Sequence, residues 1–203
     1  QFGLAVALSG DTALVGAHSD DIDSAIEQGS AYVFVRSETA WSLQAKLLAS
    51  DGVGGDQFGR AVALYGDEAL IGAYTDDVGA NQDQGSAYLF RRSGSEWTEH
   101  AHLIASDGAE SDVFGLGVAL SSDAAMVGAT GIVGVSGWTG AVYAFRAVPA
   151  VVSIARTDPS PTGSTCPPSH RSANPSAATA SRTAARARLA RPVSVRSAST
   201  RPT

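Results

Sequence analysis

Cysteine is almost absent from this sequence, and residues 1–147 contain none. The single cysteine, Cys166, lies well beyond them, so this part of the chain has neither a disulfide nor a cysteine-based metal site. The chain also lacks any run of about 18 apolar residues, which excludes a membrane-spanning helix. Apolar residues at the helical spacing i, i+3, i+4, i+7 are missing throughout residues 1–147 as well. These absences favour a β-rich domain that folds without disulfides.

Basic residues are scarce in the first part of the chain and abundant in the last. Residues 1–147 contain six Lys or Arg against 19 acidic residues, a formal balance of −13. Residues 148–203 contain eight Arg and the single acid Asp158, a balance of +7. An acidic domain argues against a nucleic-acid partner, because phosphates must be neutralised by cations. It favours cations or basic partners.

A repeat of 56 residues dominates the sequence. Phe2-Gly3 recurs as Phe58-Gly59 and Phe114-Gly115, and "GSAY" at residues 29–32 recurs at 85–88. Each copy contains four short apolar or alternating segments separated by turn residues, which predicts strands near 4–8, 13–17, 30–36 and 41–49 of the first copy. Four antiparallel strands per repeat are typical of β-propeller blades. A β-sandwich is the alternative, but a sandwich gives no reason for a fixed sequence period.

The segments "FGLAVALSGDTALVGA" and "GSAYVF" resemble the two halves of the FG-GAP repeat of integrin α subunits and many bacterial surface proteins. The resemblance implies an all-β, partial β-propeller of about three four-stranded antiparallel blades on an extracellular or cell-surface protein. We place the blades at 2–57, 58–113 and an incomplete 114–147, followed by a disordered Arg/Ser/Pro/Ala-rich tail at 148–203.

Aromatic residues at repeated positions predict the packing of these blades. We expect Phe2, Phe58 and Phe114 to be equivalent buried plugs between blades, and Trp41 and Trp97 to be buried in the blades. Propellers close with four to eight blades, so we expect the chain either to be a piece of a longer protein, which we favour, or to self-associate.

Successive strands of a blade run in opposite directions, so every second loop emerges on the same face of the propeller. Acidic residues collect in the loops of one such face. We take these loops, between strands 2 and 3 and between strands 4 and 1, as the candidate ligand-binding face. The alternative is that these residues cap turns through their own backbone. The candidate residues are Asp20, Asp21, Asp51, Asp56, Asp76, Asp77, Asp107 and Asp112.

Calcium is the one metal that the resemblance brings into question, because such repeats often hold it in an Asp-rich loop between strands 1 and 2. Here that connection is only the turn 9–12, with the single carboxylate Asp11, whereas calcium takes six to eight oxygen ligands. We therefore expect no cofactor, with only a weak calcium candidate at Asp20, Asp21 and Asp23. His100 and His102 lie two residues apart, but we interpret them as solvent-facing strand residues.

Catalytic motifs such as GxSxG, HExxH or a P-loop do not occur. We therefore expect a non-enzymatic binding or adhesion module whose ligand is a protein or a polysaccharide. The alternatives are a structural propeller segment beside a catalytic domain, or a carbohydrate-active propeller in which Trp41 and Trp97 stack on sugar. The tail could be a basic arm, a flexible linker or an out-of-frame translation.

Overall fold

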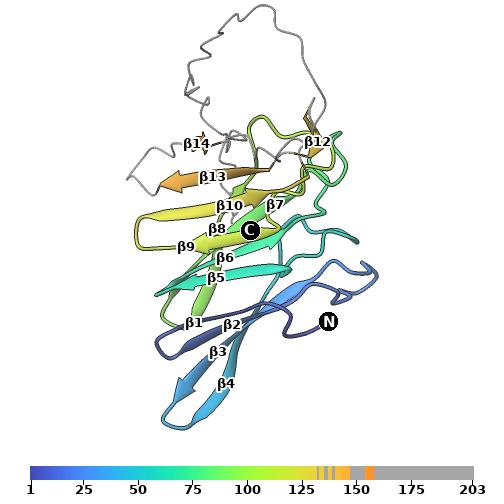
Figure 1. Ribbon diagram of the computed structural model, residues 1–203. Helices are drawn as coiled ribbons and strands as arrows, with labels where there is room; N and C mark the ends of the chain where they lie inside the picture. The colour runs from blue at the N-terminus through green and yellow to red at the C-terminus, as the bar shows by residue number, and fades with distance from the viewer. Residues whose placement is uncertain (132, 135–136, 139, 147–153, 158–203) are drawn as a thin grey trace, which may run out of the picture.

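Three antiparallel sheets of four strands make up most of the described part of this protein, and they stack in chain order (Figure 1). The computed structural model describes residues 1–131, 133–134, 137–138, 140–146 and 154–157, and these contain no helix. The all-β prediction and the antiparallel four-stranded blades are therefore confirmed. We call the sheets blades 1, 2 and 3.

Blades 1 and 2 have the same strand order, with each strand paired to the next in sequence. Blade 1 consists of β1 (Val6–Ser9), β2 (Thr12–Ala17), β3 (Ser30–Ser37) and β4 (Ala40–Leu47). Blade 2 consists of β5 (Ala61–Tyr65), β6 (Glu68–Ala73), β7 (Ser86–Ser93) and β8 (Glu96–Leu103). The observed strands begin and end within two residues of the predicted ones, because the turn residues between them fix where pairing stops.

Blade 3 contains one strand that the sequence did not predict. It consists of β9 (Gly117–Leu120), β10 (Ala124–Ala129), β13 (Ala141–Arg146) and β14 (Ile154–Thr157), and the short pair β11 (Val133–Gly134) and β12 (Gly137–Trp138) lies between β10 and β13. The prediction that the tail has no secondary structure is wrong at β14, which pairs with β13 from Val142↔Thr157 to Phe145↔Ile154. The rest of that prediction falls on residues outside the described part of the chain.

The core of the protein lies between the blades. One apolar cluster joins the face of blade 1 that is turned toward blade 2 with the facing side of blade 2, and a second cluster joins blades 2 and 3 in the same way. We call the side of each blade that faces the preceding blade its leading face, and the other side its trailing face. Innermost strands of neighbouring blades lie in contact, β1 with β5 and β5 with β9. A blade is therefore stable largely because its two neighbours cover its faces.

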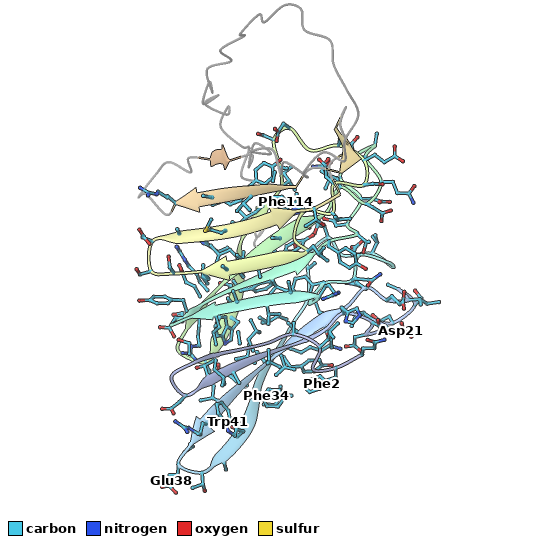
Figure 2. All side chains as sticks on the ribbon, in the orientation of Figure 1. Phe2, Asp21, Phe34, Glu38, Trp41 and Phe114 are labelled. Carbon is cyan, nitrogen blue, oxygen red and sulfur yellow. The ribbon has the colours of Figure 1, made fainter. Side chains whose placement is uncertain are left out.

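Phe58 and Phe114 are the centre of these two clusters, and both are fully buried. Phe58 contacts Tyr88 edge-on at 5.5 Å between ring centroids, and Phe114 contacts Tyr143 in the same way at 5.2 Å. Phe2 contacts Tyr32 of its own blade at 5.4 Å, yet Phe2 is 62% exposed. The predicted plug between blades is thus confirmed for Phe58 and Phe114. The predicted burial of Phe2 is wrong, because no described blade covers the leading face of blade 1 (Figure 2).

A β-bulge in the outer hairpin changes which side chains share a face. Pairing of β3 with β4 shifts between Val33 and Phe34, and the same shift recurs between Leu89 and Phe90. One extra residue in the outer strand moves the following side chains to the other face of the sheet. Leu47 consequently lies in the core between blades 1 and 2, whereas Trp41 is 44% exposed.

Trp97 occupies the repeat position of Trp41 and is only half-buried. Its indole Nε1–H donates to Oε1 of Gln44 in blade 1 at 2.9 Å, and the guanidinium of Arg92 lies over its ring. The prediction that both tryptophans are buried equivalently is therefore wrong for Trp41. The difference arises because a preceding blade covers Trp97 but not Trp41.

Candidate functional site

The loops form two opposite edges of the stack of sheets, and their charges differ. One edge carries the β2–β3, β4–β5, β6–β7 and β8–β9 loops, and the other carries the short hairpin turns. Asp21 lies at the first edge and Glu38 at the second (Figure 2). We call the first the acidic edge and the second the hairpin edge.

The acidic edge presents exposed carboxylates from both blades 1 and 2 and from the loop into blade 3. Ion pairs within the described part of the chain neutralise only Asp20, Asp51 and Asp76 there, through Lys46 and His102. The exposed members of this edge are Asp21, Asp23, Glu27, Asp51, Asp77, Asp107 and Glu110.

Three of the eight candidate aspartates, Asp56, Asp76 and Asp112, are buried, and Asp56 and Asp112 each cap their own turn. Asp56 accepts a hydrogen bond from the Val53 amide at 2.6 Å, and Asp112 accepts one from the Ala109 amide at 2.7 Å. Burial raises the pKa of Asp56 to about 6, with the neighbouring Asp76 adding to the rise. A buried carboxylate bonded to its own loop cannot reach an external ligand. These two positions match the capping alternative.

Asp21 and Asp77 also hold their loops, but they stay exposed. The Asp21 carboxylate accepts from the Glu27 amide and the Asp77 carboxylate accepts from the Asp83 amide, each at 2.8 Å. Each carboxylate has a second oxygen that can accept further hydrogen bonds. These two residues can therefore cap a loop and contact a partner at once.

Asp51 and Asp107 connect neighbouring blades. The Tyr88 hydroxyl donates to Asp51 at 2.9 Å, and the Tyr143 hydroxyl donates to Asp107 at 3.0 Å. In both pairs the aspartate follows the last strand of one blade and the tyrosine belongs to the next. This contact between adjacent blades recurs because the repeat supplies both partners.

His102 strengthens the junction between blades 1 and 2. Its ring stacks on Tyr88 at 4.5 Å, with Nδ1 3.3 Å from Asp51 and Nε2 3.5 Å from Asp76. Burial alone would lower the pKa of His102, but the two carboxylates raise it to about 9. Hydrogen bonding to His102 in turn lowers the pKa of Asp51 to about 2.

His102 is thus a charged junction residue and not the solvent-facing residue that the sequence predicted. His100 is exposed, and its electrostatic neighbours are Arg91 and Glu68. The bulge in β8 separates the environments of these two histidines. Sequence reasoning missed His102 because its repeat counterpart is Lys46. Both residues nevertheless place a cation beside an aspartate at the equivalent repeat position, Lys46 beside Asp20 and His102 beside Asp76.

Asp20, the counterpart of Asp76, is held within blade 1. Burial alone would raise its pKa, but hydrogen bonds from Ser30, Lys46 and Tyr32 together lower it. In the part of the chain that the structure describes, no three His, Cys, Asp or Glu side chains gather in a way that could hold a metal ion. The structure therefore does not join Asp20 with Asp21 and Asp23 into one ligand set.

The hairpin turns do not fit the calcium loop that the family resemblance implies. Asp11 is the one carboxylate of its turn, and it pairs with Arg36 at 2.6 Å. Asp67 pairs with Arg92 at 2.6 Å in the same way. A carboxylate engaged with a guanidinium on a two-residue turn leaves too few oxygens to surround calcium.

The comparison with protein families agrees with this arrangement. The FG-GAP repeat matches residues 1–34, 41–90 and 97–145, so each of the three blades is covered. Curated proteins gave no match to the chain. No helix within the described residues is long and apolar enough to cross a membrane.

Proposed function

Because this chain belongs to the FG-GAP repeat family, we propose that it is a non-enzymatic binding module of a secreted or surface protein, and that its acidic edge meets the partner. The observation that carries the proposal is the contrast between the two edges. On the hairpin edge, Arg36, Arg91 and Arg92 pair with Asp11, Glu68 and Asp67. Glu38, Glu96 and Asp123 are the exposed acids of that edge outside the ion pairs of the described residues. The acidic edge keeps Asp21, Asp23, Glu27, Asp77 and Glu110 outside every ion pair formed among the described residues.

A partner with a Lys- or Arg-rich surface fits this edge best. Like-sign carboxylates from successive blades produce one negative field, which attracts a cationic surface and repels an acidic polysaccharide. The rigid sheets hold the loops in place, so a partner would pay little entropy to order them. A basic protein segment is therefore the partner class that we favour among the expected protein and polysaccharide ligands.

The absence of enzymatic activity is part of the same proposal. Among the described residues, His, Tyr and Asp side chains cluster around His102 at a blade junction, and both of its imidazole nitrogens face carboxylates. Its Tyr–Asp contact recurs between Tyr143 and Asp107, as expected of a structural element. Sugar stacking on Trp41 gains no support, since Trp97 uses the same position to pack on the preceding blade.

Charge removal on the acidic edge tests the proposal. The triple variant Asp21→Asn, Asp23→Asn and Asp77→Asn removes three exposed charges, while each Asn still offers an oxygen to cap its loop. Binding of a short Lys/Arg-rich peptide, measured by isothermal titration calorimetry at low salt, should weaken about ten-fold, since exposed ion pairs contribute up to about 1 kcal/mol each.

The matched control removes three charges from the hairpin edge, through Glu38→Gln, Glu96→Gln and Asp123→Asn. All three residues are exposed, so the two triple variants have the same net charge. Peptide affinity of the control should stay near that of the unaltered chain. Equal weakening in both variants would show that net charge alone attracts the peptide, and the acidic edge would lose its assignment.

A further inference from the structure

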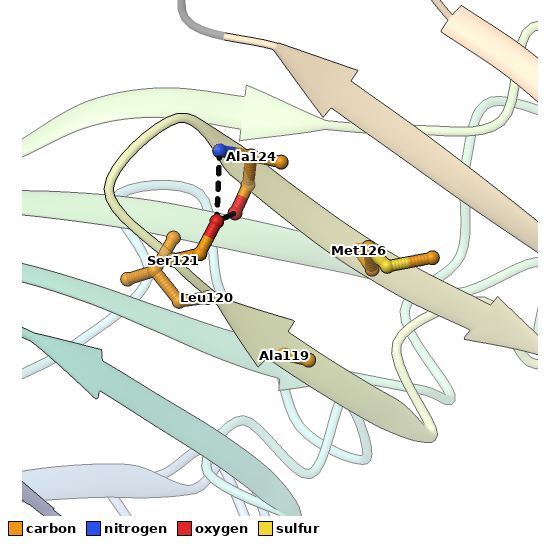
Figure 3. Close-up of a pocket in the computed structure, with 5 residues that line it drawn as sticks. All are labelled: Ala119, Leu120, Ser121, Ala124 and Met126. Carbon is orange, nitrogen blue, oxygen red and sulfur yellow. Dashed lines mark hydrogen bonds between the residues drawn. The ribbon is translucent and has the colours of Figure 1, made fainter.

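Exposed apolar side chains of this protein are of two kinds, and their repeat counterparts distinguish them. The open hollow on the trailing face of blade 3 is of the first kind (Figure 3). Two of the residues that line it, Ala119 and Met126, correspond to Ala63 and Leu70, which pack in the apolar cluster between blades 2 and 3. Such a surface belongs to the contact between blades, so its exposure points to no ligand.

Ile26 and Val53, which we call the apolar pair, are of the second kind. Ile26 lies in the β2–β3 loop and Val53 in the β4–β5 loop, both at the acidic edge, and they are 70% and 55% exposed. Their counterparts Gln82 and Ala109 are exposed as well, although described blades pack on both faces of blade 2. Neighbouring blades therefore leave these positions open, and blade 1 fills them with aliphatic side chains.

Backbone contacts bring the two loops of the apolar pair together. The Gly55 amide donates to the Ile26 carbonyl at 2.9 Å, and a Cβ added at Gly54 would lie 3.1 Å from the same carbonyl O. The Val53 amide donates to the buried carboxylate of Asp56 at 2.6 Å. The apolar pair is thus held on adjoining segments of two fixed loops.

The loops do not need these two side chains in order to fold. In blade 2 the Ser111 amide donates to the Gln82 carbonyl at 2.9 Å, which repeats the bond between the two loops. The Ala109 amide donates to Asp112 at 2.7 Å, which repeats the cap. A polar and a small residue therefore support the same backbone, and folding does not explain the isoleucine and the valine of blade 1.

Exposed carboxylates flank the apolar pair on both loops. Asp23 and Glu27 belong to the β2–β3 loop, and Asp51 belongs to the β4–β5 loop. Asp23 stands where blade 2 has Gly79, so the loop that carries isoleucine also carries an additional charge. An apolar centre inside a charged rim is the arrangement in which protein interfaces concentrate affinity and specificity.

We propose that the apolar pair takes a large aliphatic side chain of a partner segment, while the carboxylates around it contact Lys or Arg residues on either side of that side chain. The proposal rests on the proposed function, and it adds a preference that charge alone does not supply. Charge complementarity attracts basic segments to the acidic edge. Burial of an aliphatic side chain against the apolar pair then selects among those segments.

Isothermal titration calorimetry with two nine-residue peptides tests the proposal. Each peptide has four lysines on either side of its central residue, which is leucine in one and serine in the other, so their charges are equal. The unaltered chain should bind the leucine peptide about ten-fold more tightly, because the leucine is buried against the apolar pair. Salt screens charges but not apolar burial, so raising it should weaken both peptides and keep their ratio.

The double variant Ile26→Gln and Val53→Ala gives blade 1 the residues that blade 2 has at these positions, so its loops should fold unchanged. Its affinity for the leucine peptide should fall to that for the serine peptide, which should itself stay the same. Leu43→Gln, which changes a 56% exposed residue of β4 outside the acidic edge, is the control that should keep the ten-fold preference. Unchanged circular dichroism spectra and melting temperatures show that both variants are folded.

Three results would overturn the proposal, and they separate it from the proposed function. Equal affinity of the two peptides for the unaltered chain would show that charge alone governs binding, which leaves the proposed function intact. A preference for leucine that survives in the double variant would place the apolar contact elsewhere. Binding of neither peptide at low salt would overturn the proposed function and this proposal together.

Discussion

Alanine substitution at three equivalent glycines should have sharply different effects, although each change adds the same methyl group. In Gly16→Ala and Gly72→Ala the new Cβ would overlap a backbone carbonyl of the next blade, whereas in Gly128→Ala its nearest neighbour lies at 3.6 Å. Backbone on both sides of the contact cannot move aside as a flexible side chain could. The first two variants must therefore push two blades apart.

The magnitude follows from this geometry. Overpacking a core costs about 1–3 kcal/mol, and we expect about 3 kcal/mol for Gly16→Ala and Gly72→Ala because two backbones collide. For a chain of this length the loss corresponds to a decrease in melting temperature of roughly 6–12 °C. Gly128→Ala should change the free energy of unfolding by less than about 1 kcal/mol, with a small gain because glycine is unfavourable inside a strand.

Thermal and urea unfolding of the three variants would measure these differences. Equal destabilisation at Gly16, Gly72 and Gly128 would refute the reasoning, since it would show that loss of backbone freedom, and not contact between blades, sets the effect. No destabilisation at Gly16 and Gly72 would mean that the blades are not in backbone contact.

Two further predictions concern the junction between blades 1 and 2. The pKa of His102 is raised to about 9 from 6.5. Protonated His102 therefore adds roughly 3 kcal/mol to the free energy of unfolding below pH 6.5, and this stabilisation is lost as the pH rises through about 9. Urea unfolding at several pH values should show this loss in His100→Gln but not in His102→Gln. Phe58→Ala should lower the free energy of unfolding by about 3–5 kcal/mol because the ring is fully buried, whereas Phe2→Ala should lower it by under about 1 kcal/mol because the ring is 62% exposed. Similar losses of stability at both positions in urea unfolding would contradict the observed difference in burial.

The sequence repeat predicts much of this fold because local signals and spacing agree. Turn residues mark the strand ends, and the recurrence of Phe-Gly at 56 residues predicts contact between blades. The capping aspartates are predictable for the same reason: Asp56 and Asp112 repeat, and each bonds to the amide three residues before it.

Other features depend on contacts that a repeat pattern does not express. The bulges in β4 and β8 move side chains across the sheet, and strict alternation therefore misplaces Trp41 and His102. Exposure of Phe2 and Trp41 depends on what covers blade 1, which is a property of neighbours and not of the residues themselves. β14 escaped prediction because Ile154–Thr157 lies in a segment whose composition is typical of disorder.

Residue-resolved hydrogen exchange tests most directly the central claim that Phe58-Gly59 and Phe114-Gly115 dock on the preceding blade. The Phe58 amide donates to the Gln28 carbonyl and the Phe114 amide to the Gln84 carbonyl, both at 2.9 Å across a blade junction. The amides of Phe58 and Phe114 should exchange only on global unfolding, whereas the amide of Phe2 should exchange as fast as that of an unstructured peptide. Equally fast exchange at all three positions would show that the blades fold without docking on one another, and would contradict the account.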